Sequence, residues 1–310
     1  MPEFYLVPKG LVRRLPWLTR LIHRIEAAVF YTVFWLIRRL SLERALGVSG
    51  ALFYLAGRLS DKRRKADTNL AIAFPEKDAA WRRRTTREIF RHLGYSMVEL
   101  IKLDQIWAEK ERRIEFVLED GARAHMERGG PTLFMTAHVG PWQVAPLITR
   151  EYAFTINTVY APESNPVMNE VMRELRESLG ERLIPADAGP RPIMRELEAG
   201  RSIAVAMDTR PDTGKLIPFF GRDALTNTSA AGLALRAGAT LMVVRAERLG
   251  RGRYRITACD PIASPDRQRP LKEQAVAMTE RVYAHFEQWI RENPEQWICL
   301  KRRWPKEHRL

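Results

Sequence analysis

Beyond Arg113, short apolar runs alternate along the chain with segments of helical pattern. The apolar runs are typical of buried strands, and the segments between them repeat apolar residues at helical spacing and close with glycine. This alternation of strands and helices predicts an α/β domain with a mixed, largely parallel sheet flanked by helices. The predicted strands are 132–138, 154–161, 202–208, 240–249 and 253–260, and the predicted helices are 78–102, 165–180, 191–200 and 228–238.

The N-terminal segment does not show this alternation of strands and helices. Residues 16–40 contain an apolar centre from Ala27 to Ile37, which is shorter than the about 20 residues that a simple spanning helix needs. We expect a helix that lies in the membrane interface or enters it at a tilt, and the alternative is a soluble helix packed on the core. Aromatic residues suited to the headgroup boundary are Trp17, Tyr31 and Trp35.

A second apolar stretch, 49–58, ends in the basic run 62–65. Cations beside apolar helices are attracted to anionic lipid at the cytoplasmic rim of a membrane. We therefore predict two parts, membrane-associating helices in residues 1–60 and the α/β domain in residues 61–310. A cleaved signal peptide is not expected, since the region before the apolar core is too long.

The net charge of +14, from 51 Lys and Arg against 37 Asp and Glu, argues for an anionic partner such as a membrane surface or an acidic protein. The basic clusters lie beside apolar segments, and no zinc-finger spacing or aromatic RNA-binding motif accompanies them, so no nucleic-acid partner is predicted. Cys259 and Cys299 suggest neither a disulfide framework nor a metal cluster, and are predicted to be packed, reduced thiols. No metal site is predicted.

The candidate chemistry centres on His138, at the end of a predicted strand in the segment "LFMTAHVGPWQVAP". Ligands of open α/β sheets collect at the carboxyl ends of strands, and Asp208 also falls at such an end. Nucleophile elbows of the G-x-S-x-G type and H-E-x-x-H metal motifs are absent from the sequence. Pro141 suits the first position of a helix, so Gln143 would be its third residue, where its side chain could simply cap the helix.

The segment "TAHVGPWQVAPLI" resembles the H-x(4)-D/E box of the glycerolipid acyltransferase superfamily, in the form found in the HtrB-like late acyltransferases of lipid A biosynthesis. Further blocks are similar to that family in the expected order. They are "RRKADTNLAIAFPEK" (63–77), "YAPESNPVMNEVMRELRESLG" (160–180), "AMDTRPDTGKLIPFFGRDALTNT" (206–228) and "ENPEQWICLKRRWP" (292–305).

The resemblance implies an O-acyltransferase at the cytoplasmic face of the bacterial inner membrane that needs no cofactor. A histidine, here His138, would act as general base on a hydroxyl of a lipid acceptor, which attacks the thioester of acyl carrier protein or acyl-CoA. The family's acidic partner of this histidine is Gln143 here, and the family's arginine in its Y-R-P block is Ala161. A glutamine carbonyl could hold the useful tautomer of the imidazole, but it brings no negative charge.

The matching blocks also suggest residues that contact substrates. Asp208 and Arg210 would meet the acceptor headgroup or phosphate, and Arg176 and Arg191 are candidate phosphate ligands. Phe219, Phe220 and Gly221 are expected to form a tight turn that lines the acyl pocket, or a plain core turn. The sequence leaves two functions open, an active acyltransferase and a catalytically impaired relative that serves as a lipid-binding or scaffold protein. A carboxylate from elsewhere in the chain, such as Asp208 or Glu163, within hydrogen-bonding reach of His138 would favour the enzyme.

Overall fold

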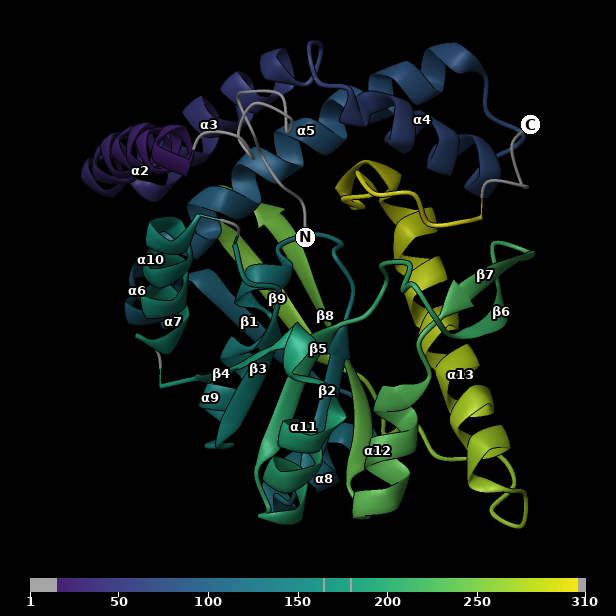
Figure 1. Ribbon diagram of the computed structural model, residues 1–310. Helices are drawn as coiled ribbons and strands as arrows, with labels where there is room; N and C mark the ends of the chain where they lie inside the picture. Colours follow the sequence, from purple (N-terminus) through teal and green to yellow (C-terminus); the bar gives the residue numbers. More distant parts are fainter. Residues whose placement is uncertain (1–15, 164, 179, 306–310) are drawn as a thin grey trace.

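The computed structural model describes residues 16–163, 165–178 and 180–305, and its centre is a seven-stranded mixed sheet (Figure 1). The strand order is β1-β9-β8-β2-β5-β3-β4. β8, β2, β5, β3 and β4 run parallel, whereas the β8–β9 hairpin reverses the chain, so β9 and its parallel neighbour β1 run the other way. The strands are β1 (Ile114–Leu118), β2 (Thr132–Thr136), β3 (Ile156–Tyr160), β4 (Arg182–Pro185), β5 (Ser202–Ala206), β8 (Thr240–Gly250) and β9 (Arg253–Ala258).

This architecture confirms the predicted α/β fold with a largely parallel mixed sheet. The predicted strands and helices all overlap observed ones, with ends that differ by a few residues. β1, β4 and a separate antiparallel hairpin of β6 (Lys215–Phe219) and β7 (Arg222–Thr226) were not predicted. These strands are short and only partly buried, so they lack the continuous apolar run by which the others were found.

Helices cover both faces of the sheet because successive side chains of a strand point to opposite faces. In β2, Leu133 and Met135 belong to a core shared with α11 (Pro190–Glu198), α12 (Ser229–Ala237) and α13 (Leu271–Glu292). Phe134 belongs to a second core on the other face, shared with α6 (Leu103–Ala108), α8 (Asp120–Arg128) and α9 (Leu147–Glu151). The remaining helices are α2 (Pro16–Arg39), α3 (Leu42–Ala56), α4 (Lys62–Ala73), α5 (Ala79–Ile101), α7 (Lys110–Arg113) and α10 (Pro166–Glu177).

The N-terminal helices α2 and α3 have one packed side and one exposed side. Leu42 and Ala45 of α3 are buried in the second core, and α3 crosses α5 so closely that a Cβ on Gly94 would lie 2.7 Å from the Ser49 carbonyl oxygen. No helix in the described ranges is both long and apolar enough to cross a bilayer. Among the described side chains of the two helices, the large apolar ones that are exposed are Leu21, Ile25, Val29, Tyr31, Val33, Trp35, Leu36, Val48, Leu52 and Leu55.

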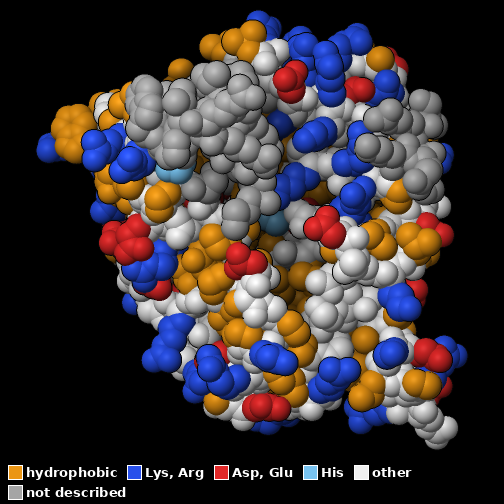
Figure 2. All heavy atoms as spheres, viewed as in Figure 1, with side chains coloured by type: hydrophobic (Ala, Val, Ile, Leu, Met, Phe, Trp, Pro, Cys, Tyr) orange, Lys and Arg blue, Asp and Glu red, His pale blue; other side chains and the backbone are white. Residues whose placement is uncertain are grey.

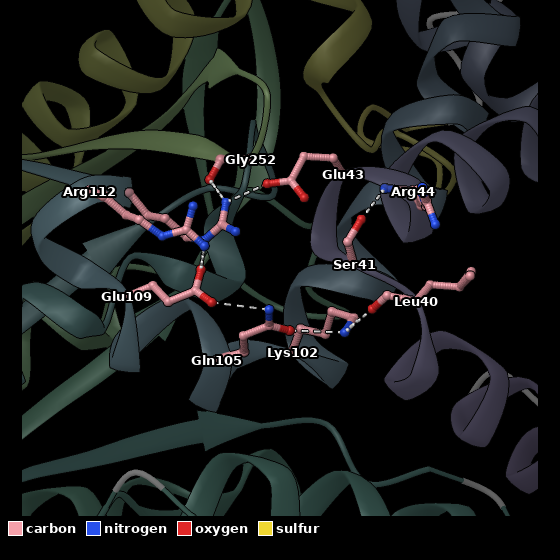
Figure 3. Close-up of polar contacts among 10 residues, drawn as sticks. Leu40, Ser41, Glu43, Arg44, Lys102, Gln105, Glu109, Arg112 and Gly252 are labelled. Atoms are coloured by element: carbon pink, nitrogen blue, oxygen red, sulfur yellow. Dashed lines mark hydrogen bonds and ion pairs between the residues drawn. The ribbon is translucent and has the colours of Figure 1, made fainter.

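Buried cations fix the junction between α2 and α3 to the rest of the molecule (Figure 3). Lys102 Nζ donates to the Leu40 carbonyl oxygen at 2.7 Å and to Gln105 Oε1 at 2.9 Å. The buried Arg113 donates to Glu43 Oε1 at 2.9 Å, and also to Glu109. The N-terminal helices are therefore joined to the sheet-containing part by specific polar contacts as well as by apolar packing.

Candidate active site

The register of β2 and β5 brings two distant residues together at the carboxyl edge of the sheet. Leu133 pairs with Ile203 and Thr136 with Ala206, so residues 70 apart in the sequence lie opposite each other. Two residues beyond both strands, His138 therefore meets Asp208. The Asp208 carboxylate oxygen Oδ1 lies 2.6 Å from His138 Nδ1 and accepts a hydrogen bond of 2.9 Å from the His138 backbone N–H.

Asp208 is held ionised within the protein, with only 3% of its surface exposed. Burial by itself would raise the pKa of this carboxyl group. The charge of His138, the two hydrogen bonds from His138 and a third from Trp297 outweigh burial, so the net pKa is below the usual value. Trp297 Nε1 donates to Oδ2 at 3.1 Å, so both carboxylate oxygens have partners.

The contact with Asp208 decides what the imidazole can do. Because Nδ1 points at a carboxylate, its proton stays on Nδ1 and Nε2 is left with the lone pair. The His138 side chain is 31% exposed, and the ring of Trp142 packs edge-on against it with centroids 5.3 Å apart. The His138 ring thus contacts the buried Asp208 carboxylate through Nδ1, while part of the ring is accessible to solvent.

The structure shows neither of the two contacts expected for Gln143. Within the part of the chain that is described, no hydrogen bond joins Gln143 to His138, and the short 3₁₀ helix Trp142–Val144 has no side-chain cap. Pro141 takes the position before that helix, with φ −85° and ψ 54°. The carboxylate of Asp208 occupies the place by Nδ1 that we expected for Gln143, because adjacent strands bring it closer than the turn brings the residue five positions on.

The C-terminal block, residues 292–305, fixes the loop that carries His138. Ile298 N–H donates to the His138 carbonyl oxygen at 2.8 Å, and Gly140 N–H donates to the Gln296 carbonyl oxygen at 3.1 Å. Gly140 has φ +64°, and a Cβ there would lie 2.5 Å from the Ala246 carbonyl oxygen. Only glycine therefore allows this turn to approach β8 so closely. Sequence reasoning recognised the block containing Trp297 but gave it no part in the site.

The sequence pattern of the bacterial lipid A biosynthesis acyltransferases matches residues 18–306 of the 310 residues. The chain belongs to this family. It is accordingly an acyltransferase by family, and the match extends over both the N-terminal helices and the sheet. No curated protein matches the sequence.

The other predicted substrate contacts of this acyltransferase are spread along the carboxyl side of the sheet and beyond it. Arg210 is exposed two residues after Asp208, and Arg191 is exposed in the first turn of α11. Arg176, on α10, is half-buried with its guanidinium 6.0 Å from the ring centroid of Tyr160, and burial lowers its pKa. Among the described residues, no hydrogen bond or ion pair joins these arginines to His138, and their roles remain predictions.

Phe219, Phe220 and Gly221 form the tight turn that the sequence indicated, between β6 and β7. Phe220 (φ 54°) and Gly221 (φ 68°) both have positive φ, as in a two-residue hairpin turn. Both phenyl rings are buried and pack against the indole of Trp297. The turn therefore supports the residue that contacts Asp208, whereas its contact with an acyl chain remains a prediction.

The face of the acyltransferase seen in Figure 2 is hollowed at its centre, where hydrophobic side chains line the recess. Lys and Arg side chains gather over α4 and α5 above it, and the exposed residues of this kind include Arg63, Arg64 and Lys65. Cys259 and Cys299 are buried free thiols, and burial raises the pKa of both. Among the described residues, no group of His, Cys, Asp and Glu is arranged to hold a metal ion.

Proposed function

We propose that this acyltransferase moves a fatty acyl chain from a thioester donor to a hydroxyl of a lipid acceptor, with His138 as general base and Asp208 as its partner. The acceptor is of the lipid A precursor type or another glycolipid or aminolipid. The observation that carries the proposal is the 2.6 Å contact between His138 Nδ1 and the buried Asp208 carboxylate. It supplies the negative charge that Gln143 lacks, and this favours an enzyme over the catalytically impaired scaffold.

In this mechanism, Nε2 of His138 takes the proton of the acceptor hydroxyl as its oxygen attacks the thioester carbonyl carbon. Asp208 stabilises the imidazolium that forms and keeps the ring in place. When the tetrahedral intermediate collapses, the carbon–sulfur bond breaks and the imidazolium returns the proton to the leaving thiolate. The products are the acylated lipid and the free thiol of the carrier.

The test compares His138→Ala and Asp208→Asn with the wild type, using radiolabelled acyl carrier protein and acyl-CoA donors and a panel of lipid acceptors. We expect each substitution to lower kcat by about 10²–10⁴-fold, because general-base assistance is of that size. Arg191→Ala, an exposed change on α11, serves as the comparison for a predicted binding role and should raise KM without a comparable loss of kcat. A wild type that binds lipid but transfers no acyl group from either donor would favour the scaffold function.

We also propose that the protein binds the cytoplasmic face of the inner membrane through α2 and α3. The exposed residues Leu21, Ile25, Val29 and Val33 recur every four positions, so they form one stripe along α2. An apolar stripe with cations nearby is typical of a helix that lies in the interface. The membrane surface, if anionic, would add attraction to the net charge of +14.

The same charge supports an acidic acyl carrier protein as the donor, with acyl-CoA as the alternative. Oppositely charged partners associate faster, and salt screens the attraction. We expect kcat/KM for the acyl carrier protein donor to fall about tenfold or more between 50 and 500 mM salt. A preference for acyl-CoA that ionic strength leaves unchanged would contradict this choice of donor.

A further inference from the structure

We infer that Trp297 is a positioning residue for the reaction: its indole N–H holds the Asp208 carboxylate so that the other oxygen faces His138. The inference rests on the proposed function of His138 and Asp208. It assigns a role to a residue in the C-terminal block, about 90 positions from Asp208 in the sequence.

The first support is geometric. Asp208 Oδ1 accepts from the His138 ring and backbone, while Oδ2 accepts from Trp297 Nε1 at 3.1 Å. A carboxylate with a donor on only one oxygen can rotate about its Cβ–Cγ bond, whereas donors on both oxygens fix its plane. Trp297 is 1% exposed, so water cannot take over its hydrogen bond.

The second support is the way in which Trp297 itself is held. Its ring stacks on Phe220 with an interplanar angle of 17° and meets Phe219 and Trp304 edge-on. Its neighbours in the chain are tied to the His138 loop, through Ile298 N–H to the His138 carbonyl oxygen. The indole therefore has little freedom to turn away, and the same segment positions both members of the pair.

The third support is that the other titratable groups around Asp208 keep one charge state near neutral pH. The groups that face Asp208 besides His138 are Tyr283 on α13 and Cys299 and Arg303 of the C-terminal block. Burial raises the pKa of Tyr283 to about 12 and also raises the pKa of Cys299, so both stay neutral. Burial lowers the pKa of Arg303, whose guanidinium nevertheless stays charged near neutral pH. A difference in pH profile between variants at Trp297 would thus not come from these neighbours.

The chain offers a matched control in Trp304. It is fully buried in the same aromatic cluster, and its Nε1 has no hydrogen-bond partner among the described residues. Trp297→Phe and Trp304→Phe therefore remove similar volume from one cluster, but only Trp297→Phe removes a donor to Asp208. We compare kcat, KM and the pH profile of kcat/KM between pH 5 and 9.

For Trp297→Phe we expect kcat to fall about tenfold with KM unchanged. Without the donor on Oδ2 the Asp208 carboxylate is more basic, so a proton on the His138–Asp208 pair is held more tightly. The acid limb, which is the fall of kcat/KM at low pH, should then move up by about one pH unit. Trp304→Phe should leave the acid limb in place, even where it lowers thermal stability. Equal losses and identical pH profiles in the two variants would mean that Trp297 only fills space, and would overturn the inference.

A second measurement needs neither activity nor the Trp297 variant. In protein labelled with ¹⁵N-tryptophan, one of the eight indole N–H signals should move upfield in Asp208→Asn, because the charge-assisted hydrogen bond weakens. If no indole signal responds, the inference fails. If the wild type transfers no acyl group but one indole signal does respond, the proposed function fails while the positioning of Asp208 by Trp297 stands.

Discussion

At the scale of single residues, the substitution of glutamine at position 143 is balanced by a carboxylate from a neighbouring strand. Asp208 lies beside His138 Nδ1, where it supplies both orientation and charge. We therefore expect Gln143→Glu to change kcat by no more than about twofold, since the general-base contribution is already in place. Steady-state kinetics at pH 7.5 would check this, with Asp208→Asn as the inactive reference. A tenfold gain would instead mean that position 143 reaches the imidazole during turnover.

A second residue-scale prediction concerns stability and pH. His92 accepts a hydrogen bond from Arg248 Nη1 at 2.9 Å, and burial together with the charge of Arg248 lowers the His92 pKa to about 3. Below pH 6.5, His92 is therefore protonated in the unfolded chain, whereas in the folded protein it stays neutral down to about pH 3. Stability present above pH 6.5 is lost across this window, by up to ~1.4 kcal/mol per pH unit.

The comparison is His92→Asn, whose side-chain oxygen can accept the same hydrogen bond from Arg248. In urea unfolding at a series of pH values from 7 to 4, the free energy of unfolding should fall less steeply with pH in the variant. The difference in slope should correspond to about one proton taken up on unfolding. Parallel curves for the two proteins would show that His92 does not contribute to acid destabilisation.

Among the helices, the polar contacts in Figure 3 hold the junction between α2 and α3, and the start of α3, against α6 and α7. The Arg113 side chain is 3% exposed and contacts Glu43, Glu109 and the Gly252 carbonyl oxygen. We expect Arg113→Ala to lower the free energy of unfolding by about 2–3 kcal/mol, because it removes a buried cation and its hydrogen bonds. The loss is not larger because Glu43 is half-exposed and regains water when its partner is removed. Limited proteolysis should then cut between α2 and α3 earlier than in the wild type.

Arg112 provides the control for that experiment. It also contacts Glu109, but its side chain is 64% exposed. Exposed ion pairs contribute little, so Arg112→Ala should cost less than about 1 kcal/mol and leave the proteolysis pattern unchanged. If Arg113→Ala costs as little as Arg112→Ala, the contacts of Arg113 do not hold the junction.

At the scale of the whole molecule, the exposed sides of α2 and α3 can be tested without disturbing the core. Deleting residues 1–60 would remove Leu42 and Ala45 from the buried core, so point substitutions are the cleaner change. We expect the combination of Trp35→Ser, Leu52→Ser and Leu55→Ser to weaken binding to anionic phospholipid vesicles roughly 100-fold in a sedimentation assay.

The matching control lies elsewhere on the surface. Leu216 and Leu271 are also exposed, on β6 and α13, and their replacement by serine should leave vesicle binding unchanged. An equal loss of binding in this control would indicate nonspecific adsorption. If the wild type itself stays in the supernatant at low salt, the proposed membrane association is wrong.

The fold class could be predicted from the sequence, since apolar periodicity reports burial and the period differs between strands and helices. The sequence also placed His138 and Asp208 at strand ends, because those strands are nearly continuous apolar runs with a clear boundary. Which partner each residue has depends on the tertiary structure. The register of β2 against β5 and the return of residues 296–298 to the His138 loop join positions 70 to 160 residues apart. Such pairings depend on strand order and chain packing, and no local pattern in a single sequence records them. For that reason the residue five positions after His138 seemed the natural partner, although the fold brings Asp208 there instead.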